Sequence, residues 1–257
     1  MTSWYAPSRD DGDEHAGSDS DASNGVLYTL LVPIDLFLIA LEGDVDAAEK
    51  VLDASEIERA NRFRRPHLRE RYILSHAVLR LLLGRAAKSD PRALRFVLGE
   101  KGKPRLEGSR VTFNLSHSGD FAAIALTDEI EVGVDVEEMR PLRDFERLAR
   151  HTFSSGECAD FFTLNGDALA PGFYRCWTRK EAVIKALGAG LSYPLKKFRV
   201  SLLPDEAPSV LEIGVEGAWQ LHSFDVADGY AGALAYRGKR RDVAITRASA
   251  AAVISRC

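Results

Sequence analysis

Three acidic residues have the types and the spacing to bind a metal ion. In the stretch VGVDVE, residues 132–137, strand alternation puts three valines on one face and Asp135 and Glu137 on the other. A third acid, Glu181, follows in WTRKEAVIK, residues 177–185, which has helical character. If Glu181 faces the strand, the three carboxylates converge, and oxygen ligands of this kind suit a hard cation such as Mg²⁺.

Two lysines flank the third acid and suit phosphate oxygens: Lys180 and Lys185. A plainer interpretation competes with this one. Asp135 and Glu137 could be the solvent face of an edge strand. Glu181 and Lys185 are spaced i,i+4, and such a surface pair stabilises a helix by only a few tenths of a kcal/mol.

An arginine-rich region precedes these motifs and could bind a phosphate through charge-assisted hydrogen bonds. Our picks for this role are Arg59, Arg62 and Arg71. They lie near the ends of two expected helices, one over residues 56–64 and one that Pro66 opens and Gly84 stops. The alternative is that most of these arginines form a solvated face.

A polar cluster, Asn114–Gly119, sits between two expected strands of the middle region. Its hydroxyl, imidazole and turn amide groups could bind an anion. The alternative is a hairpin turn in which Ser and Asn cap their own backbone.

Composition limits the class of protein. The chain has 257 residues, 46% of them hydrophobic, enough for a substantial core. A net charge of −4 gives no general affinity for nucleic acid or for a membrane surface. Its three cysteines, at positions 158, 176 and 257, are too scattered for a disulfide framework, which favours a reduced, cytoplasmic setting.

The order of expected elements suggests an α+β fold with two similar α/β halves in a pseudo-twofold arrangement. Each half would have a small, mainly antiparallel sheet and one long helix, with the active site at the seam. We expect a disordered acidic tail at residues 1–25, halves at 26–130 and 131–245, and a C-terminal tail at 246–257.

Five segments in register resemble the phosphopantetheinyl transferases of the large monomeric kind, over residues 52–198. The strongest are GVDVE at 133–137 and W-x-x-K-E-A-x-x-K at 177–185; the others are Gly102–Pro104, Asn114–Ser118 and the Arg59/Arg62/Phe63 run. That family transfers the 4′-phosphopantetheine arm of coenzyme A to a serine of a carrier protein, needs Mg²⁺, and releases adenosine 3′,5′-bisphosphate.

The resemblance also implies roles for individual residues. Asp135, Glu137 and Glu181 would hold Mg²⁺, with Mn²⁺ as an alternative, and Glu181 would also take the serine proton. The CoA contacts would be divided among the pyrophosphate (Lys180, Lys185), the 3′-phosphate (Arg59, Arg62, Arg71, His117) and the adenine and phosphate region (Lys103, Pro104, Ser116).

Two other functions stay open at this stage. A Mg²⁺-dependent nucleotide hydrolase could use the same acids, and a non-enzymatic module could bind CoA or a carrier protein. For the transferase we expect acyl and peptidyl carrier proteins as partners, with a docking surface near residues 153–164. We expect no nucleic acid, no membrane, and a chain that suffices as a monomer.

Overall fold

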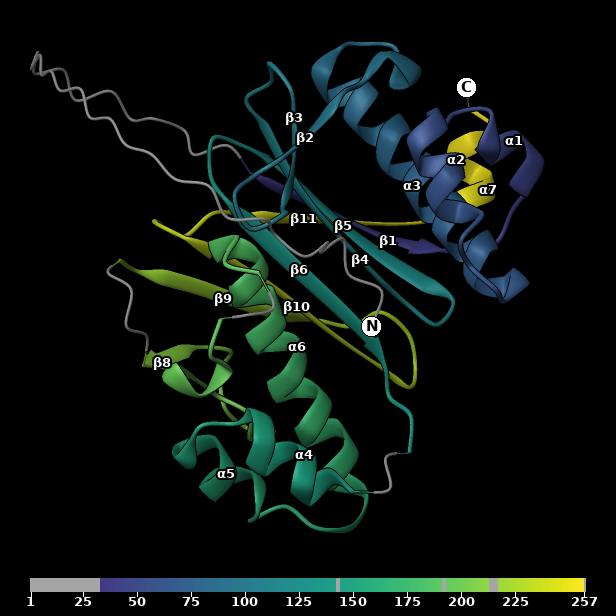
Figure 1. The fold of residues 1–257 in the computed structure, drawn as a ribbon. Coiled ribbons are helices and arrows are strands. Elements are labelled where there is room, and N and C mark those ends of the chain that lie inside the picture. The colour runs from purple at the N-terminus through teal and green to yellow at the C-terminus, as the bar shows by residue number, and fades with distance from the viewer. Residues whose placement is uncertain (1–32, 142–143, 191–192, 213–216, 257) are drawn as a thin grey trace, which may run out of the picture.

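The described part of the computed structural model, residues 33–141, 144–190, 193–212 and 217–256, is built in four layers. Helix α3 (Pro66–Ala87) covers a four-stranded sheet in the order β11-β1-β5-β4. A three-stranded sheet in the order β6-β10-β9 follows, and helix α6 (Leu169–Leu187) covers its other face. Figure 1 shows α1, α2, α3 and α7 gathered at one side of the strands and α4, α5 and α6 at the other.

The strands are mostly short and antiparallel. Their bounds are β1 Ile34–Ala40, β2 Phe96–Leu98, β3 Pro104–Leu106, β4 Val111–Ser118, β5 Phe121–Asp128, β6 Val132–Glu138, β7 Arg199–Val200, β8 Val210–Glu212, β9 Trp219–Phe224, β10 Tyr230–Arg237 and β11 Val243–Ser249. The remaining helices are α1 Val45–Glu49, α2 Ala54–Ala60, α4 Phe145–Thr152, α5 Ser155–Phe161 and α7 Ala250–Ile254. This mixed α/β fold with small antiparallel sheets agrees with the expected class.

Three apolar cores separate the four layers. The first lies between α3 and the four-stranded sheet, and the third lies between the three-stranded sheet and α6. The middle core lies between the two sheets, where Val132, Val134 and Val136 of β6 pack with residues such as Leu36 of β1. The strand alternation predicted for VGVDVE is therefore confirmed, and its acids lie on the face toward α6.

Helix α3 is longer than the sequence pattern predicts. We expected Gly84 to end it, but the helix continues to Ala87, and Lys88 adopts the left-handed conformation that terminates it. A Cβ at residue 84 would lie 2.8 Å from a ring carbon of Pro91. Gly84 thus allows a close approach between the helix and the following segment, which is a second reason for a glycine at this place.

Helix α6 contains all of residues 177–185, for which the sequence indicates helical character; it begins at Leu169 and is ended by Gly188 in the left-handed conformation. The helix before it, α5, opens with a capping box, because Ser154 accepts a hydrogen bond from the Glu157 amide and Glu157 accepts one from the Ser154 amide. Both features fix the ends of the helices that carry the second half's polar groups.

The end of the described chain returns to the first half. Strand β11 pairs in parallel with β1, from Ile34 opposite Val243 to Ala40 opposite Ser249. Helix α7 then packs into the same core as α3, through Ala250 and Val253. The expected boundary at residue 245 therefore falls inside a strand of the first half's sheet, and residues 246–256 are not a separate tail.

Some expectations concern residues outside the described ranges, chiefly the acidic tail at residues 1–25. The pseudo-twofold relation between the halves also stays a prediction. None of the helices in the described part is long and apolar enough to cross a membrane.

Candidate functional site

The two sheets meet along the edges β4 and β6, and side chains rather than backbone groups join them. Alternate residues of β4 accept hydrogen bonds from β6 amides: Asn114 from Val134 at 2.8 Å, Ser116 from Val136 at 3.4 Å, and Ser118 from Glu138 at 3.1 Å. The expected polar turn at Asn114–Gly119 is thus mostly strand, and only its last residue belongs to the turn. The side chains satisfy the amides of an edge strand that would otherwise lack partners.

The same β4 hydroxyls also hold the β6 acids. Ser116 donates to Asp135 Oδ1 at 2.9 Å, and Ser118 donates to Glu137 Oε2 at 2.9 Å. Each serine therefore orients one carboxylate while it joins the two sheets. This double use explains why short hydroxyl side chains alternate on β4.

A glycine brings the acids of β6 close to α6. A Cβ at residue 133 would lie 2.1 Å from the Ala182 carbonyl oxygen and 2.3 Å from the Ala186 amide nitrogen. Any side chain at Gly133 would therefore push the strand and the helix apart. Because of this contact, Asp135 on the strand and Glu181 on the helix share one buried space.

Lys185 is the cation at the centre of this space. Its Nζ donates to Asp135 Oδ1 at 2.6 Å, to Ser116 Oγ at 2.9 Å and to the Val134 carbonyl at 3.2 Å. Asp135 is only 3% exposed, and its other oxygen, Oδ2, is buried without a hydrogen-bond partner in the described structure. Asp135 is therefore not part of a solvated edge, and one of its oxygens can accept a further ligand.

The three acids influence one another's protonation. Burial, and then the charge of Asp135, raise the pKa of Glu181 to about 7, although Lys185 opposes the shift. Burial and the charge of Asp135 also raise the pKa of Glu137. Among the residues that the structure describes, no group of three or more His, Cys, Asp or Glu side chains is set at metal-binding geometry. The three acids thus influence one another electrostatically, but their side chains would have to rotate before they could bind a metal ion together.

Lys180 lies apart from this cluster. It is fully buried, and its Nζ donates to both Glu157 oxygens at 2.6 Å and to the Phe198 carbonyl at 2.7 Å. Glu157 also accepts the Val200 amide at 2.8 Å. All three ammonium protons of Lys180 are therefore used in tying α5, α6 and β7 together, and the expected pyrophosphate contact is not supported.

The predicted 3′-phosphate residues are divided between two environments. Arg71 on α3 forms an ion pair with Asp120 at 2.5 Å. Burial has the largest effect on the pKa of His117, and the charges of Lys185 and Arg71 act in the same direction. Together they lower the pKa of His117 to about 4, so that its ring is neutral at pH 7. Arg71, His117 and Lys185 thus form a connected basic region beside the acids.

The other two arginines differ from each other. The Arg59 guanidinium lies 6.0 Å from the ring centre of Tyr72, and its charge also acts on His76, a neighbour of His117. Arg62 is exposed and pairs with Glu58 at 2.5 Å, one helical turn away. Arg62 therefore matches the alternative of a solvated face, whereas Arg59 lies on the side of the basic region.

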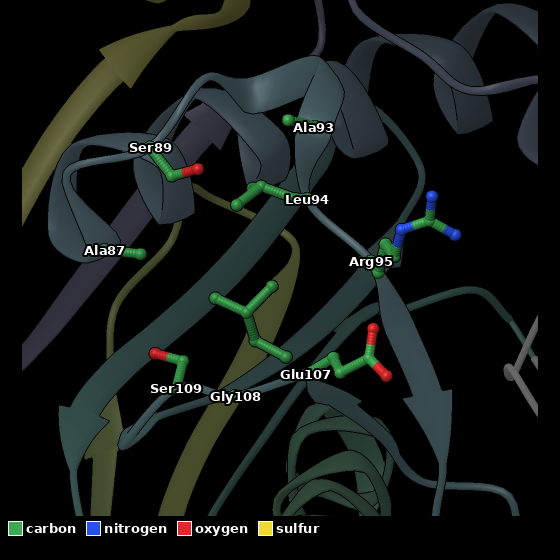
Figure 2. A pocket seen from close by; sticks show the side chains of 9 residues that line it. Ala87, Ser89, Ala93, Leu94, Arg95, Glu107, Gly108 and Ser109 are labelled. Carbon is green, nitrogen blue, oxygen red and sulfur yellow. The ribbon is translucent and has the colours of Figure 1, made fainter.

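Lys103 and Pro104 lie at the opposite end of the seam. Lys103 Nζ donates to Glu131 Oε2 at 2.6 Å and to the Val132 carbonyl at 2.8 Å. Both residues line a cavity of about 370 Å³ beside the β2–β3 hairpin. A different cavity, of about 300 Å³ and lined in part by Leu94, Arg95 and Glu107 (Figure 2), contains none of the predicted site residues.

Sequence reasoning missed several residues that shape the site. These are Glu157, which holds Lys180; Asp120, which pairs with Arg71; and Glu131, which pairs with Lys103. Ser118 belongs to the predicted polar cluster, but its hydrogen bond to Glu137 was not predicted. The capping-box spacing of Ser154 and Glu157 was the one sequence signal for Glu157. The contacts of Asp120 and Glu131 join segments far apart in the chain.

Comparison with known proteins gives matches over both halves. Residues 131–235 match the model of the 4′-phosphopantetheinyl transferase superfamily, and residues 41–129 match the model described as 4′-phosphopantetheinyl transferase, N-terminal. The two matches together include every residue of the predicted site. They meet between β5 and β6, close to the seam.

Individual relatives agree with these matches. The 4′-phosphopantetheinyl transferase HetI of Nostoc is 33% identical over 201 residues, 77% of this chain and 83% of HetI. The 4′-phosphopantetheinyl transferase Sfp of Bacillus subtilis is 30% identical over 174 residues, 67% of this chain and 76% of Sfp. A relative from Synechocystis is 35% identical over 161 residues, and the match spans just under two thirds of its length, 64%.

Among solved structures, a holo-(acyl-carrier-protein) synthase from Bacillus anthracis in complex with CoA (3′,5′-ADP) matches with a TM-score of 0.38 and 18% identity. That match covers 43% of this chain and 98% of the synthase chain.

Proposed function

This chain belongs to the 4′-phosphopantetheinyl transferase superfamily, and from that premise we propose the reaction that its site performs. It transfers the 4′-phosphopantetheine arm of coenzyme A to a serine of an apo carrier protein, depends on Mg²⁺, and releases adenosine 3′,5′-bisphosphate. Its partners are acyl and peptidyl carrier proteins.

One observation carries the proposal: a lysine, two acids and a serine from three different elements meet in one buried space at the seam. Lys185 contacts Asp135 and Ser116, and the charges of Asp135 and Lys185 both act on Glu181. A phosphate anhydride needs charge neutralisation and alignment when it is cleaved, more than it needs a covalent intermediate. A cation beside paired acids and a basic region is suited to that task.

The donor set fits a hard cation. Asp135 Oδ2 is buried without a partner, and two neighbouring carboxyls have raised pKa values, so a cation would relieve their repulsion. Asp135, Glu137 and Glu181 would hold Mg²⁺. When bound, Mg²⁺ neutralises charge on the pyrophosphate oxygens.

Glu181 is also suited to take the proton from the carrier serine. In the metal-free chain the pKa of Glu181 is raised to about 7. A cation beside it would lower this pKa and keep the carboxylate ionised, which is the form that accepts a proton. Lys185 would neutralise a pyrophosphate oxygen, a role that its position beside Asp135 supports. Arg71 and His117 would receive the 3′-phosphate at the adjoining basic region.

The experiment is transfer to purified apo acyl and peptidyl carrier proteins, followed by intact-protein mass spectrometry. With CoA and Mg²⁺ present, the carrier should gain about 340 Da, the mass of the arm moved by phosphoryl-type transfer. Adenosine 3′,5′-bisphosphate should appear in equal amount, and EDTA should stop both. Carriers of unchanged mass after incubation with the folded chain would refute the proposal.

Two variants sharpen the test. Asp135→Asn should reduce the rate of transfer by a factor on the order of 10²–10³, because it removes a charge at the reacting phosphates. Glu146→Gln is the matched control, since Glu146 is exposed on α4 and pairs only across one turn with Arg150. Equal loss in both variants would mean that the seam acids have no special role.

A further inference from the structure

We propose that Asp120 sets the affinity and the selectivity for coenzyme A, because its carboxylate occupies the guanidinium of Arg71 that a substrate phosphate must take. CoA would then bind by exchanging one anion for another. The inference rests on the proposed function, and it adds a residue that competes with the substrate instead of contacting it.

The pair is arranged so that only one partner can leave. Arg71 and Asp120 are 2.5 Å apart, but Arg71 is 22% exposed and Asp120 is 74% exposed. The guanidinium therefore lies inset on α3, whereas the carboxylate lies at the rim of the site. A carboxylate that is already mostly hydrated can return to water at small cost, and the guanidinium then remains for a new anion.

The backbone beneath Asp120 is held in place. Its amide donates to the Tyr230 hydroxyl at 3.0 Å, and its carbonyl accepts the Leu41 amide at 2.7 Å. Gly119 adopts a positive φ of 54°, and a Cβ there would lie 2.2 Å from the Tyr230 hydroxyl. The turn is thus fixed by both halves, so the exchange needs only rotation of the Asp120 side chain.

The surroundings of the pair carry charges of both signs. Arg71 and Lys185 both act on His117, but Lys185 is already paired with Asp135 at 2.6 Å. Glu138, which pairs with Arg140, acts on Tyr230 beside the turn. When the Asp120 carboxylate turns away, Arg71 loses the acid with which the structure pairs it. A phosphate monoester carries close to two negative charges at pH 7 and can form bidentate bonds with arginine, so it replaces a single carboxylate favourably.

The expected effect is moderate, because exposed ion pairs contribute roughly 0–1 kcal/mol, which corresponds to an affinity change of up to about fivefold. Asp120→Asn should therefore bind CoA about two- to fivefold more tightly than the unmodified chain. Asp120→Lys should bind it more tightly still. Both gains should shrink as salt is added, because the charges are near the surface.

The test is calorimetry of CoA and of 3′-dephospho-CoA with the full chain and the two variants, in low and high salt. Asp128→Asn is the matched control, since Asp128 ends the strand that begins beside Asp120. The gain should occur for CoA, and the affinity for 3′-dephospho-CoA should be unchanged. An equal gain for both ligands, or no gain relative to Asp128→Asn, overturns the inference.

The carrier assay separates this inference from the proposed function. A chain that transfers the arm normally, but whose CoA affinity does not respond to Asp120→Asn or Asp120→Lys, retains the function and refutes the role of Asp120. A chain that neither binds CoA nor modifies carriers refutes both.

Discussion

Glu181→Gln should remove a dependence of stability on pH that the seam acids create. The pKa of Glu181 rises from 4.5 to about 7 on folding, and the side chain is only 8% exposed, so solvent screening does not reduce the effect much. Since the folded pKa is the higher one, the folded state binds the proton more tightly. The stabilisation is therefore complete below about pH 4.5 and is lost as the pH rises through about 7.

The magnitude follows from the shift. At about 1.4 kcal/mol for each pKa unit, Glu181 contributes at most roughly 3 kcal/mol, of which about 2 kcal/mol is lost between about pH 5.5 and pH 8. Glutamine cannot titrate, so the variant lacks this loss. Other groups, including Glu137 with its raised pKa and His117 with its lowered pKa, contribute to both proteins and largely cancel in the comparison.

The assay is urea unfolding of both proteins in EDTA at several pH values between about 5.5 and 8. The free energy of unfolding of the unmodified chain should fall by about 2 kcal/mol more than that of Glu181→Gln over this range. Added Mg²⁺ should stabilise the unmodified chain at pH 8. Identical pH dependence in the two proteins would show that Glu181 does not lie in a desolvated acid cluster.

Three further predictions concern other residues. Lys180→Met alone should destabilise the fold by about 3–5 kcal/mol, because it leaves the buried Glu157 carboxylate without its cation. The double variant Lys180→Met/Glu157→Gln should recover most of the stability and the transfer rate. A stable but inactive double variant would instead indicate that Lys180 contacts substrate. Gly133→Ala should lower stability, by about 1–3 kcal/mol, and should also lower the transfer rate, since its Cβ would meet the α6 backbone. Denaturant unfolding beside the Gly99→Ala control, where a Cβ would lie 3.4 Å from the nearest atom outside the adjoining residues, checks the contact. The His117 ring should titrate near pH 4 in NMR spectra of the free chain. With CoA bound it should titrate at a higher pH, because a nearby phosphate favours the charged ring. An unchanged titration would place the phosphate elsewhere.

The strand acids and the helix lysine could be predicted from local periodicity. Alternation along β6 separates the valines from Asp135, and the i,i+4 spacing puts Glu181 and Lys185 on one face of α6. The same geometry shows why Lys180 was misplaced. Adjacent helical residues point about 100° apart, since a turn takes about 3.6 residues, so Lys180 and Glu181 cannot both face the same strand.

What could not be predicted depends on contacts between distant segments. Glycine commonly follows the last residue of a helix, and only the close approach of Pro91 explains why a glycine stands inside α3 at residue 84. Strand β11 exposes most of its side chains, so it lacks the alternation that marks a half-buried strand. Its place beside β1 follows from tertiary packing, for which the local pattern contains no signal.

The pairing of β11 with β1 has a consequence for the order in which the protein can be completed during synthesis. β1 and β11 are neighbours in one sheet, but the whole of the second half is translated between them. Until residues 243–254 leave the ribosome, one edge of β1 and the part of the α3 core that α7 covers stay open. The sheet and core of the first half, which carry Arg71 and His117, are therefore completed only after the acids and the lysine of the second half have been made. A chain cut short before residue 243 would have an intact second half and an unfinished first half.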